Sequence, residues 1–268
     1  MCGKVVHIIP NIGDSVTGIA ILNDQLQVGR WNHQEIAVYC PTTFQHQRSC
    51  NFTNTGYAKQ LRSVAACNTN NCIYASDQYS HWVFKINGQN YTSSDWSIGS
   101  NPQGLSMTSS HNVLIAMTDA HLLREYSTAG QVIREINLQP AGITTPVHAV
   151  QLSEELYAVT HHGPKSQFTI VNSAGQIVRS YSGDAGDLNG PHGIVDDKKG
   201  RVLVADQNNN RVLVINPKTL AAYPLPLPDC QLQGPYSLHY DAANKRLYIG
   251  EWSGGRIICC EVGRPGLL

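Results

Sequence analysis

The sequence predicts an all-β fold, a six-bladed β-propeller made of four-stranded antiparallel blades. Three observations support this prediction. A degenerate motif recurs about every 44 residues through the 268-residue chain, each copy contains short β-rich runs separated by turn residues, and the two ends of the chain carry complementary parts of the last copy. Four strands in a unit of this length are typical of a propeller blade.

The repeat is clearest in its fifth copy. That copy opens with Pro-His-Gly-Ile at 191–194 and continues with Val-Leu-Val-Ala-Asp at 202–206 and Arg-Val-Leu-Val-Ile at 211–215. The six copies align with steps of 45, 41, 44, 45 and 44 residues at Gly18, Ser63, Gly104, His148, Gly193 and Ser237. The blades are therefore expected to begin near residues 16, 61, 102, 146, 191 and 235.

The first copy illustrates the expected strands. Its β-rich runs cover 19–21, 26–28 and 36–39, and a fourth segment begins at Phe44. A solenoid lacks such four-run units and needs polar capping repeats at its ends, which this sequence does not contain. A closed ring is therefore favoured over an open array.

The ends of the chain predict how the ring closes. The sixth copy stops after its third run, at 257–260, whereas the run at 4–9 precedes the first copy and belongs to no other blade. The N-terminal strand is therefore expected to complete the last blade and to leave no open sheet edge. This arrangement uses residues 1–268 as a single propeller domain. It also places Cys2 near Cys259 or Cys260, where a closing disulfide is one alternative.

Eight cysteines are many for a cytosolic chain of this length and few for a disulfide scaffold. Cys67 and Cys72 flank a turn-rich tetrapeptide, so a disulfide across a hairpin and two free thiols are both open. Zinc at this pair would need a second ligand pair at a regular spacing, and none follows. The sequons at 51–53 and 90–92 favour an extracellular, secreted protein, with a cytoplasmic one as the alternative.

Charge composition excludes some functions. The chain has 19 basic and 19 acidic residues, a net charge of zero, and only 14% charged residues. Proteins that neutralise nucleic-acid phosphates carry a basic stripe, so no nucleic-acid partner is expected. No apolar run is long enough for a membrane span.

The fifth copy resembles an NHL repeat in its Pro-x-Gly-Ile head, its Val-Ala-Asp at 204–206 and its Asn-x-Arg-Val at 209–212. The sixth copy departs further, with Arg-Leu-Tyr-Ile-Gly-Glu at 246–251 and Gly-Arg-Ile at 255–257. The resemblance implies a six-bladed propeller of a kind that usually binds proteins or RNA. In some relatives, such as the peptide-amidating lyases, it implies a bound metal.

An opposite-charge pair recurs five residues apart across the turn between the second and third strands. It is Asp206 with Arg211 in the fifth copy and Glu251 with Arg256 in the sixth, and the signs are exchanged between Arg30 and Glu35 in the first. Such pairs most often fix turn geometry. We therefore expect a structural role, because no nucleophile or metal ligand accompanies them.

The expected ligand site is the face on which the loops between second and third strands emerge together with the loops that enter the innermost strands. Rigid scaffolds commonly present functional residues on such loops. Seven of the 11 histidines fall on this face. The expected ligand-binding residues are Trp31, His33, Arg62, Tyr79, Gln103, His121, His148, His162, His192, Tyr236 and Trp252.

Two functions compete for this face. The first is a non-catalytic, lectin-like or protein-binding platform, in which Trp31, Tyr79 and Trp252 supply flat amphipathic area and the amides and imidazoles supply uncharged hydrogen bonds. A protein and a glycan partner are equally compatible with it, and no cofactor is required.

The alternative is a metal-dependent lyase or hydrolase with zinc on His148, His161 and His192, beside Arg62 and Tyr236. The amidating lyases carry a Pro-His pair at three blade heads, whereas this chain has Pro-His only at 191–192, so the resemblance does not supply the full ligand set. His161 and His162 point to opposite sides of a strand, so at most one of them is expected to serve. RNA binding is disfavoured because these loops hold few cations beyond Arg30, Arg62 and Lys165. We therefore expect a binding module rather than an enzyme.

Overall fold

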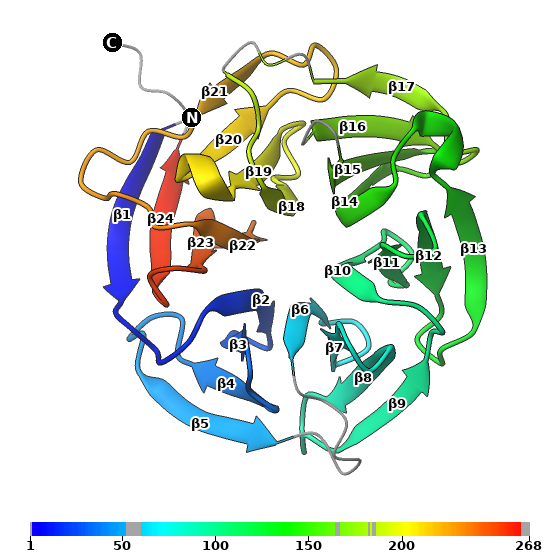
Figure 1. Ribbon diagram of the computed structural model, residues 1–268. Coiled ribbons are helices and arrows are strands. Elements are labelled where there is room, and N and C mark those ends of the chain that lie inside the picture. Colours follow the sequence, from blue (N-terminus) through cyan, green and yellow to red (C-terminus); the bar gives the residue numbers. More distant parts are fainter. Residues whose placement is uncertain (1, 52–59, 164–166, 182, 184–185, 264–268) are drawn as a thin grey trace.

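The computed structural model describes residues 2–51, 60–163, 167–181, 183 and 186–263. These residues form six four-stranded antiparallel sheets arranged as blades around a central axis, as Figure 1 shows. The all-β six-bladed propeller expected from the repeat is therefore confirmed.

Blades 1 to 3 follow one another along the chain, each running from the innermost to the outermost strand. Blade 1 contains β2 (Val16–Leu22), β3 (Gln25–Arg30), β4 (Glu35–Tyr39) and β5 (His46–Asn51). Blade 2 contains β6 (Leu61–Cys67), β7 (Cys72–Asp77), β8 (Trp82–Asn87) and β9 (Ser93–Ser97). Blade 3 contains β10 (Pro102–Met107), β11 (Val113–Met117), β12 (Leu122–Tyr126) and β13 (Val132–Asn137).

Blades 4 to 6 repeat this order, with two short 3-10 helices, η1 (Gln139–Ala141) before blade 4 and η2 (Gln207–Asn209) within blade 5. Blade 4 contains β14 (Thr145–Ser153), β15 (Leu156–His162), β16 (Gln167–Asn172) and β17 (Ile177–Ser180). Blade 5 contains β18 (Pro191–Asp196), β19 (Val202–Asp206), β20 (Arg211–Ile215) and β21 (Ala222–Pro224). Blade 6 contains β22 (Pro235–Asp241), β23 (Arg246–Glu251), β24 (Ile257–Gly263) and the N-terminal β1 (Cys2–Ile9).

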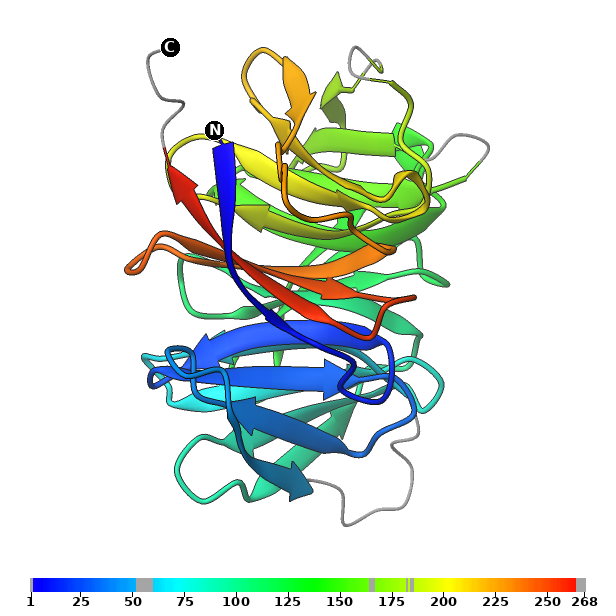
Figure 2. The ribbon, with the colours of Figure 1, turned by 90° about the vertical axis from the view of Figure 1, so that its left-hand side faces the viewer.

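The ring closes as expected, because β1 pairs antiparallel with β24 and forms the outermost strand of blade 6 (Figure 2). The register places Cys2 opposite Gly263, whereas Cys260 faces Val5. Three residues of extended chain are about 10 Å long, which exceeds the Cα separation that a disulfide can bridge. The expectation that Cys2 lies near Cys259 or Cys260 is therefore wrong.

Cys67 and Cys72 face each other across the β6–β7 hairpin but are free thiols. The Asn70 side chain donates to Cys67 Sγ at 3.3 Å, and Cys72 Sγ donates to the Asn70 carbonyl at 3.0 Å. Both thiols thus stabilise the turn directly. Of the two alternatives at this pair, the structure has the free thiols.

The hydrophobic core is divided among the wedges between blades. One wedge, for example, packs β15 and β16 of blade 4 against β18 to β20 of blade 5 through residues such as Phe168, Val204 and Leu213, all of which are fully buried. Phe44, expected to open a strand, instead lies in the turn before β5 with a positive φ of 59° and stacks on His7. Burial of apolar side chains therefore holds each blade against its neighbours, while backbone hydrogen bonds between strands hold each blade together.

Candidate functional site

Each innermost strand carries a β-bulge at its first residues. The antiparallel register with the second strand shifts at this point in all six blades. A bulge redirects a side chain out of the regular alternation, here toward the mouth of the central channel. The bulged positions hold Thr17, Arg62, Gln103, Val147, His192 and Tyr236.

Backbone hydrogen bonds fix the loops above these bulges. In blade 1 the Trp31 N–H donates to the Ser15 carbonyl at 2.9 Å, and in blade 6 the Trp252 N–H donates to the Gly234 carbonyl at 2.8 Å. The loop after the second strand is thereby held against the chain that enters the innermost strand. We call the face made by these two sets of loops the loop face.

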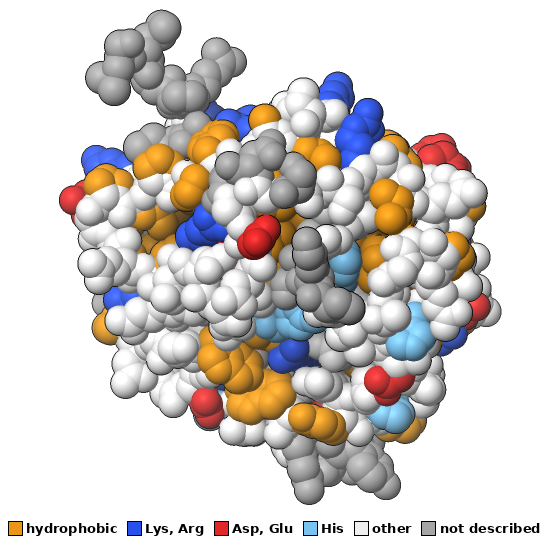
Figure 3. Space-filling view, turned by 45° about the horizontal axis from the view of Figure 1, so that its top comes forward, with side chains coloured by type: hydrophobic (Ala, Val, Ile, Leu, Met, Phe, Trp, Pro, Cys, Tyr) orange, Lys and Arg blue, Asp and Glu red, His pale blue; other side chains and the backbone are white. Residues whose placement is uncertain are grey.

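Five aromatic rings on the loop face form a continuous series. Trp31 lies 5.3 Å from Trp252, and Trp252 lies 5.0 Å from Tyr236, measured between ring centroids. Tyr236 stacks on His192 at 4.2 Å, and His192 meets His162 edge-on at 5.0 Å. We call these five residues, from blades 1, 6, 5 and 4, the aromatic belt. In Figure 3, hydrophobic and histidine side chains gather beside a Lys or Arg side chain near the middle of the molecule.

Arg62 completes this surface from blade 2. Its guanidinium carbon lies 5.1 Å from the centroid of the Tyr236 ring and 5.9 Å from that of Trp31, within cation–π range. Its Nε donates to Gln103 Oε1 at 2.7 Å. The ion pairs of arginine within the described ranges involve Arg30, Arg124, Arg134, Arg201, Arg211 and Arg256. Arg62 therefore brings a positive charge to the mouth that no described carboxylate balances.

Two imidazole nitrogens of the belt have no hydrogen-bond partner among the described residues, His162 Nε2 and His192 Nδ1. The His192 side chain is nearly buried, with the residue 8% exposed. Burial, followed by the charge of Arg62, lowers the pKa of His192 well below its ordinary value. Burial also lowers the pKa of His162. Both rings are therefore neutral at pH 7, and their two unpartnered nitrogens are buried rather than open to solvent.

His148 was expected at the mouth, but the structure places Val147 in the bulge and His148 one residue further into the channel. The other blades have Gly or Ser at this aligned position, and a Cβ on Gly104 would lie 2.3 Å from the His148 ring. His148 Nε2 donates to the Leu105 carbonyl at 2.9 Å, and His148 Nδ1 accepts from the Ile194 N–H at 3.3 Å. His148 thus joins blades 3, 4 and 5, and both of its ring nitrogens are already engaged.

The position of His148 makes stability depend on pH. Burial lowers the pKa of His148 to about 4, and a proton on Nδ1 would face the Ile194 N–H. The unfolded chain takes up this proton near pH 6.5, so the stabilisation is fully present above pH 6.5 and is lost as the pH falls toward 4. We expect His148→Gln to reduce the loss of unfolding free energy between pH 7 and 4.5 by about 2 kcal/mol. Urea denaturation at both pH values measures the free energy of unfolding. The prediction is contradicted if His148→Gln loses as much of this free energy between the two pH values as the exposed-site control His111→Gln.

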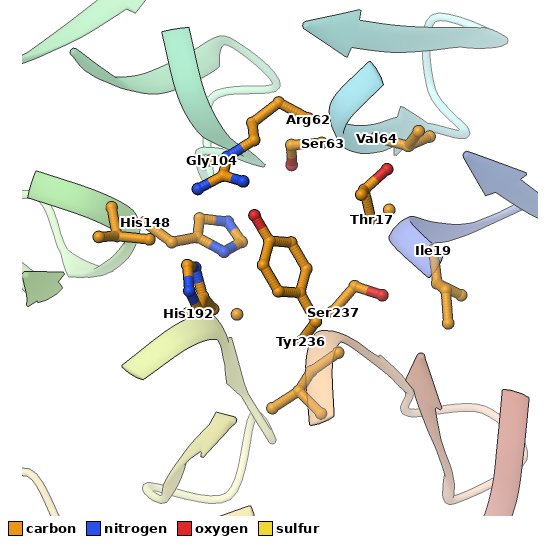
Figure 4. Close-up of a pocket in the computed structure, with 14 residues that line it drawn as sticks. Thr17, Ile19, Arg62, Ser63, Val64, Gly104, His148, His192, Tyr236 and Ser237 are labelled. Atoms are coloured by element: carbon orange, nitrogen blue, oxygen red, sulfur yellow. The ribbon is translucent and has the colours of Figure 1, made fainter. Parts of the chain in front are cut away.

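Side chains narrow the channel just below the mouth. Figure 4 shows the rings of His148 and His192 and the hydroxyl of Tyr236 converging there, with Arg62 beside them. The remaining cavity measures about 30 Å³, enough for one or two water molecules. Burial raises the pKa of Tyr236 to about 12, so its phenol stays protonated. A ligand that approaches from the loop face is therefore expected to bind at the mouth, because the cavity beneath it is too small for more than water.

Besides Arg62, Gln103 and His148, three expected ligand-binding residues are not members of the belt, and neither is His161 of the alternative zinc set. His33 lies at the rim of blade 1, 3.8 Å from Asp14 Oδ2. Tyr79 is 65% exposed on blade 2, and His121 Nδ1 lies 2.5 Å from the Thr144 carbonyl on the blade 3 side. His161 is buried within blade 4, where its Nε2 meets Thr169 Oγ1 at 3.0 Å. Lys165, counted among the cations of this face, lies outside the described residues.

The alternative zinc site on His148, His161 and His192 is not assembled. His148 and His161 are engaged with neighbouring backbone and side-chain groups, and His192 faces the belt. Across the described ranges, no three His, Cys, Asp or Glu side chains are grouped so as to hold a metal ion. The adjacent residues His161 and His162 do point to opposite sides of β15, as expected, with only His162 at the mouth.

Sequence reasoning missed one part of this face, the loop at 10–15 that enters β2. Ser15 Oγ donates to the Trp252 carbonyl at 2.7 Å, and this loop and the 252–255 turn enclose a hollow of about 300 Å³. Asp14 contributes to its lining. The signal was available, because a loop that enters an innermost strand must emerge on the loop face.

The recurrent charge pairs lie beneath these loops. Arg211 Nε donates to Asp206 Oδ2 at 2.6 Å, and Arg256 Nε donates to Glu251 Oε2 at 2.5 Å, with both carboxylates fully buried. The Asn189 N–H also donates to Asp206 Oδ1 at 2.7 Å, and the loop entering β22 bonds to Glu251 in the same way. The pairs thus fasten the loops of the loop face to the blades.

Comparison with known proteins agrees with this architecture. Residues 188–215 match the NHL repeat family model. The chain is 27% identical over 120 residues to the protein brain tumor of Drosophila melanogaster, a match that covers 43% of this chain and 11% of that protein. The chain thus corresponds to only a small part of this curated relative.

Among solved structures, a streptogramin B lyase superposes with a TM-score of 0.71 at 11% identity, covering 96% of this chain and 98% of that one. Virginiamycin B lyase from Staphylococcus aureus gives a TM-score of 0.69 at 10% identity, covering 96% and 99%. At such identities the likeness concerns the fold alone. The class of protein is therefore a six-bladed β-propeller. The matched repeat in blade 5, together with this ring, makes the chain similar to NHL-repeat propellers.

No helix among the described residues is long and apolar enough to cross a bilayer.

Proposed function

We propose that this propeller is a non-catalytic binding module that recognises a protein partner through its loop face, with the aromatic belt at the centre of the contact. The observation that carries the proposal is the continuity of the belt, in which five rings from four blades contact one another in series. Trp, Tyr and Arg are the residues that most often dominate the binding energy of protein interfaces.

The charge and hydrogen-bonding groups of the mouth define the complementary group on the partner. Arg62 is held between two rings and lacks a described carboxylate, so an acidic side chain of the partner would balance it. The rings of His162 and His192 would add uncharged aromatic surface beside it. The partner surface is thus expected to combine large apolar side chains with a carboxylate.

A protein partner is favoured over a glycan by the irregularity of the site. The six bulged positions hold six different side chains, and the belt occupies one sector of the ring rather than recurring in every blade. A repeated sugar site would place the same residues in each blade. An irregular amphipathic surface suits a single protein epitope.

A selection experiment tests the proposal. A displayed library of peptides and small domains is selected on the immobilised wild-type chain and counter-selected on Trp31→Ala/Trp252→Ala. We expect binders that prefer the wild type by at least about tenfold, carry acidic residues, and resist competition by free sugars. Binders that bind both chains equally would contradict the proposal, and glycan-array signals lost in the double variant would transfer the site to a glycan.

A further inference from the structure

A second concave site lies on the opposite face of the ring, which carries the hairpins between first and second strands and between third and fourth strands. We call this the hairpin face. A groove of about 750 Å³ lies here against blades 3, 4 and 5. It extends from Met107, at the end of the innermost strand β10, to Arg179, on the outermost strand β17. This volume is within the range of small-molecule sites.

The floor of the groove is apolar. Leu152, at the end of β14, and Leu156, at the start of β15, line it together with Ile170 of β16. Both leucines pack on the core between blades 4 and 5 but remain partly exposed. The part of this core that faces the groove is therefore not covered by protein. The apolar part of a bound ligand would shield these leucines from water.

The rim of the groove is cationic. Arg179, Lys198 and Lys218 line it, against the single carboxylate of Asp196. Lys198 Nζ lies 3.1 Å from Asp196 Oδ2, which balances one of the three cations. Among the described ion pairs, none includes Arg179 or Lys218. Among the residues that line the groove, three cations therefore face one carboxylate, while Glu154 and Glu155 lie beside it in the exposed turn between Ser153 and Leu156.

From this apolar floor and cationic rim, we propose that the groove binds a small organic acid, a carboxylate on an aryl or acyl body. The apolar body covers Leu152 and Leu156, and the carboxylate pairs with Arg179 and Lys218. A compact hydrophilic polyanion would leave the apolar floor exposed to water, and an apolar cation would be repelled by the positive charges of the rim. The site shares no residue with the aromatic belt and does not depend on the function proposed for the loop face.

Three probes with the same ring system test the charge preference: 1-naphthaleneacetate, the neutral 1-naphthaleneacetamide and the cationic 1-naphthylmethylamine. Isothermal titration calorimetry on the wild-type chain is expected to rank them in that order, with the acid about tenfold tighter than the amine. Raising the salt concentration is expected to narrow the difference. Equal binding of the three probes, or no binding of the acid at millimolar concentration, would overturn the proposal.

Variants locate the site. Arg179→Glu/Lys218→Glu is expected to weaken binding of the acid about tenfold and to strengthen binding of the amine. Lys245→Glu, in the hairpin between β22 and β23 of blade 6 on the same face, is the control and should leave all three affinities unchanged. Leu156→Gln should weaken all three probes. Trp252→Ala should change none, which separates this groove from the belt. Unchanged affinities in the charge-reversed double variant, with its circular dichroism spectrum intact, would refute the assignment.

Discussion

Trp252→Ala is expected to weaken binding of the selected protein partner by about 30-fold or more, equivalent to about 2 kcal/mol of binding free energy. Trp252 contacts both Trp31 and Tyr236, so its removal takes one ring out of the aromatic belt and separates Trp31 from the other three. The loop should keep its place, because the backbone of Trp252, not its indole, bonds to Ser15 and Gly234. Surface plasmon resonance with one selected binder measures the loss.

Tyr79→Ala is the matched control for this prediction. Tyr79 is a large aromatic residue on the same face and is 65% exposed, but among the described residues its ring does not pair with a ring of the belt. Its removal is expected to change the affinity by less than about twofold. Equal losses in the two variants would show that partners bind to exposed aromatic area in general, and the belt would lose its special role.

Arg211→Ala is expected to destabilise the protein by about 3 to 5 kcal/mol, because it leaves the fully buried carboxylate of Asp206 without its cation. Arg211 also donates to the carbonyls of Gly186 and Asp187, so the loop entering blade 5 loosens as well. Urea denaturation at pH 7 measures the loss.

A double variant separates the buried charge from these other contacts. Asp206→Asn/Arg211→Ala removes the charge together with its partner and should recover part of the stability lost in Arg211→Ala. Arg48→Ala, at an exposed site where the guanidinium lies over Tyr91, should cost less than about 1 kcal/mol. Additive losses in the double variant would contradict the importance of the buried pair.

The period of the sequence was sufficient to predict the blades, their order and the closing strand, because each blade requires four strands and every ladder must be completed. The register inside each blade was harder to predict. The bulges at the blade heads decide which side chain reaches the mouth. In blade 4 the bulge places Val147 at the edge of the mouth and His148 inside the channel. The alignment already placed His148 level with Gly104 and Gly193, which indicated a position with little space.

Contacts between blades were beyond sequence reasoning. Arg62 lies within reach of Trp31 from blade 1 and Tyr236 from blade 6 because the ring brings distant segments together at its axis. No spacing in the sequence predicts that these three side chains lie close together. The same applies to the groove on the hairpin face, whose cations come from strand β17 of blade 4 and from two hairpins of blade 5.

Hydrogen–deuterium exchange of the wild-type chain, alone and with a selected partner, tests most directly whether the loop face is the binding surface. The account predicts that the partner slows exchange at the loops 31–34 and 252–256 and at the heads of β18 and β22, and that the hairpins at 152–156 and 198–200 are unchanged. Slower exchange confined to those hairpins or to the outermost strands, with the loop face unaffected, would contradict it.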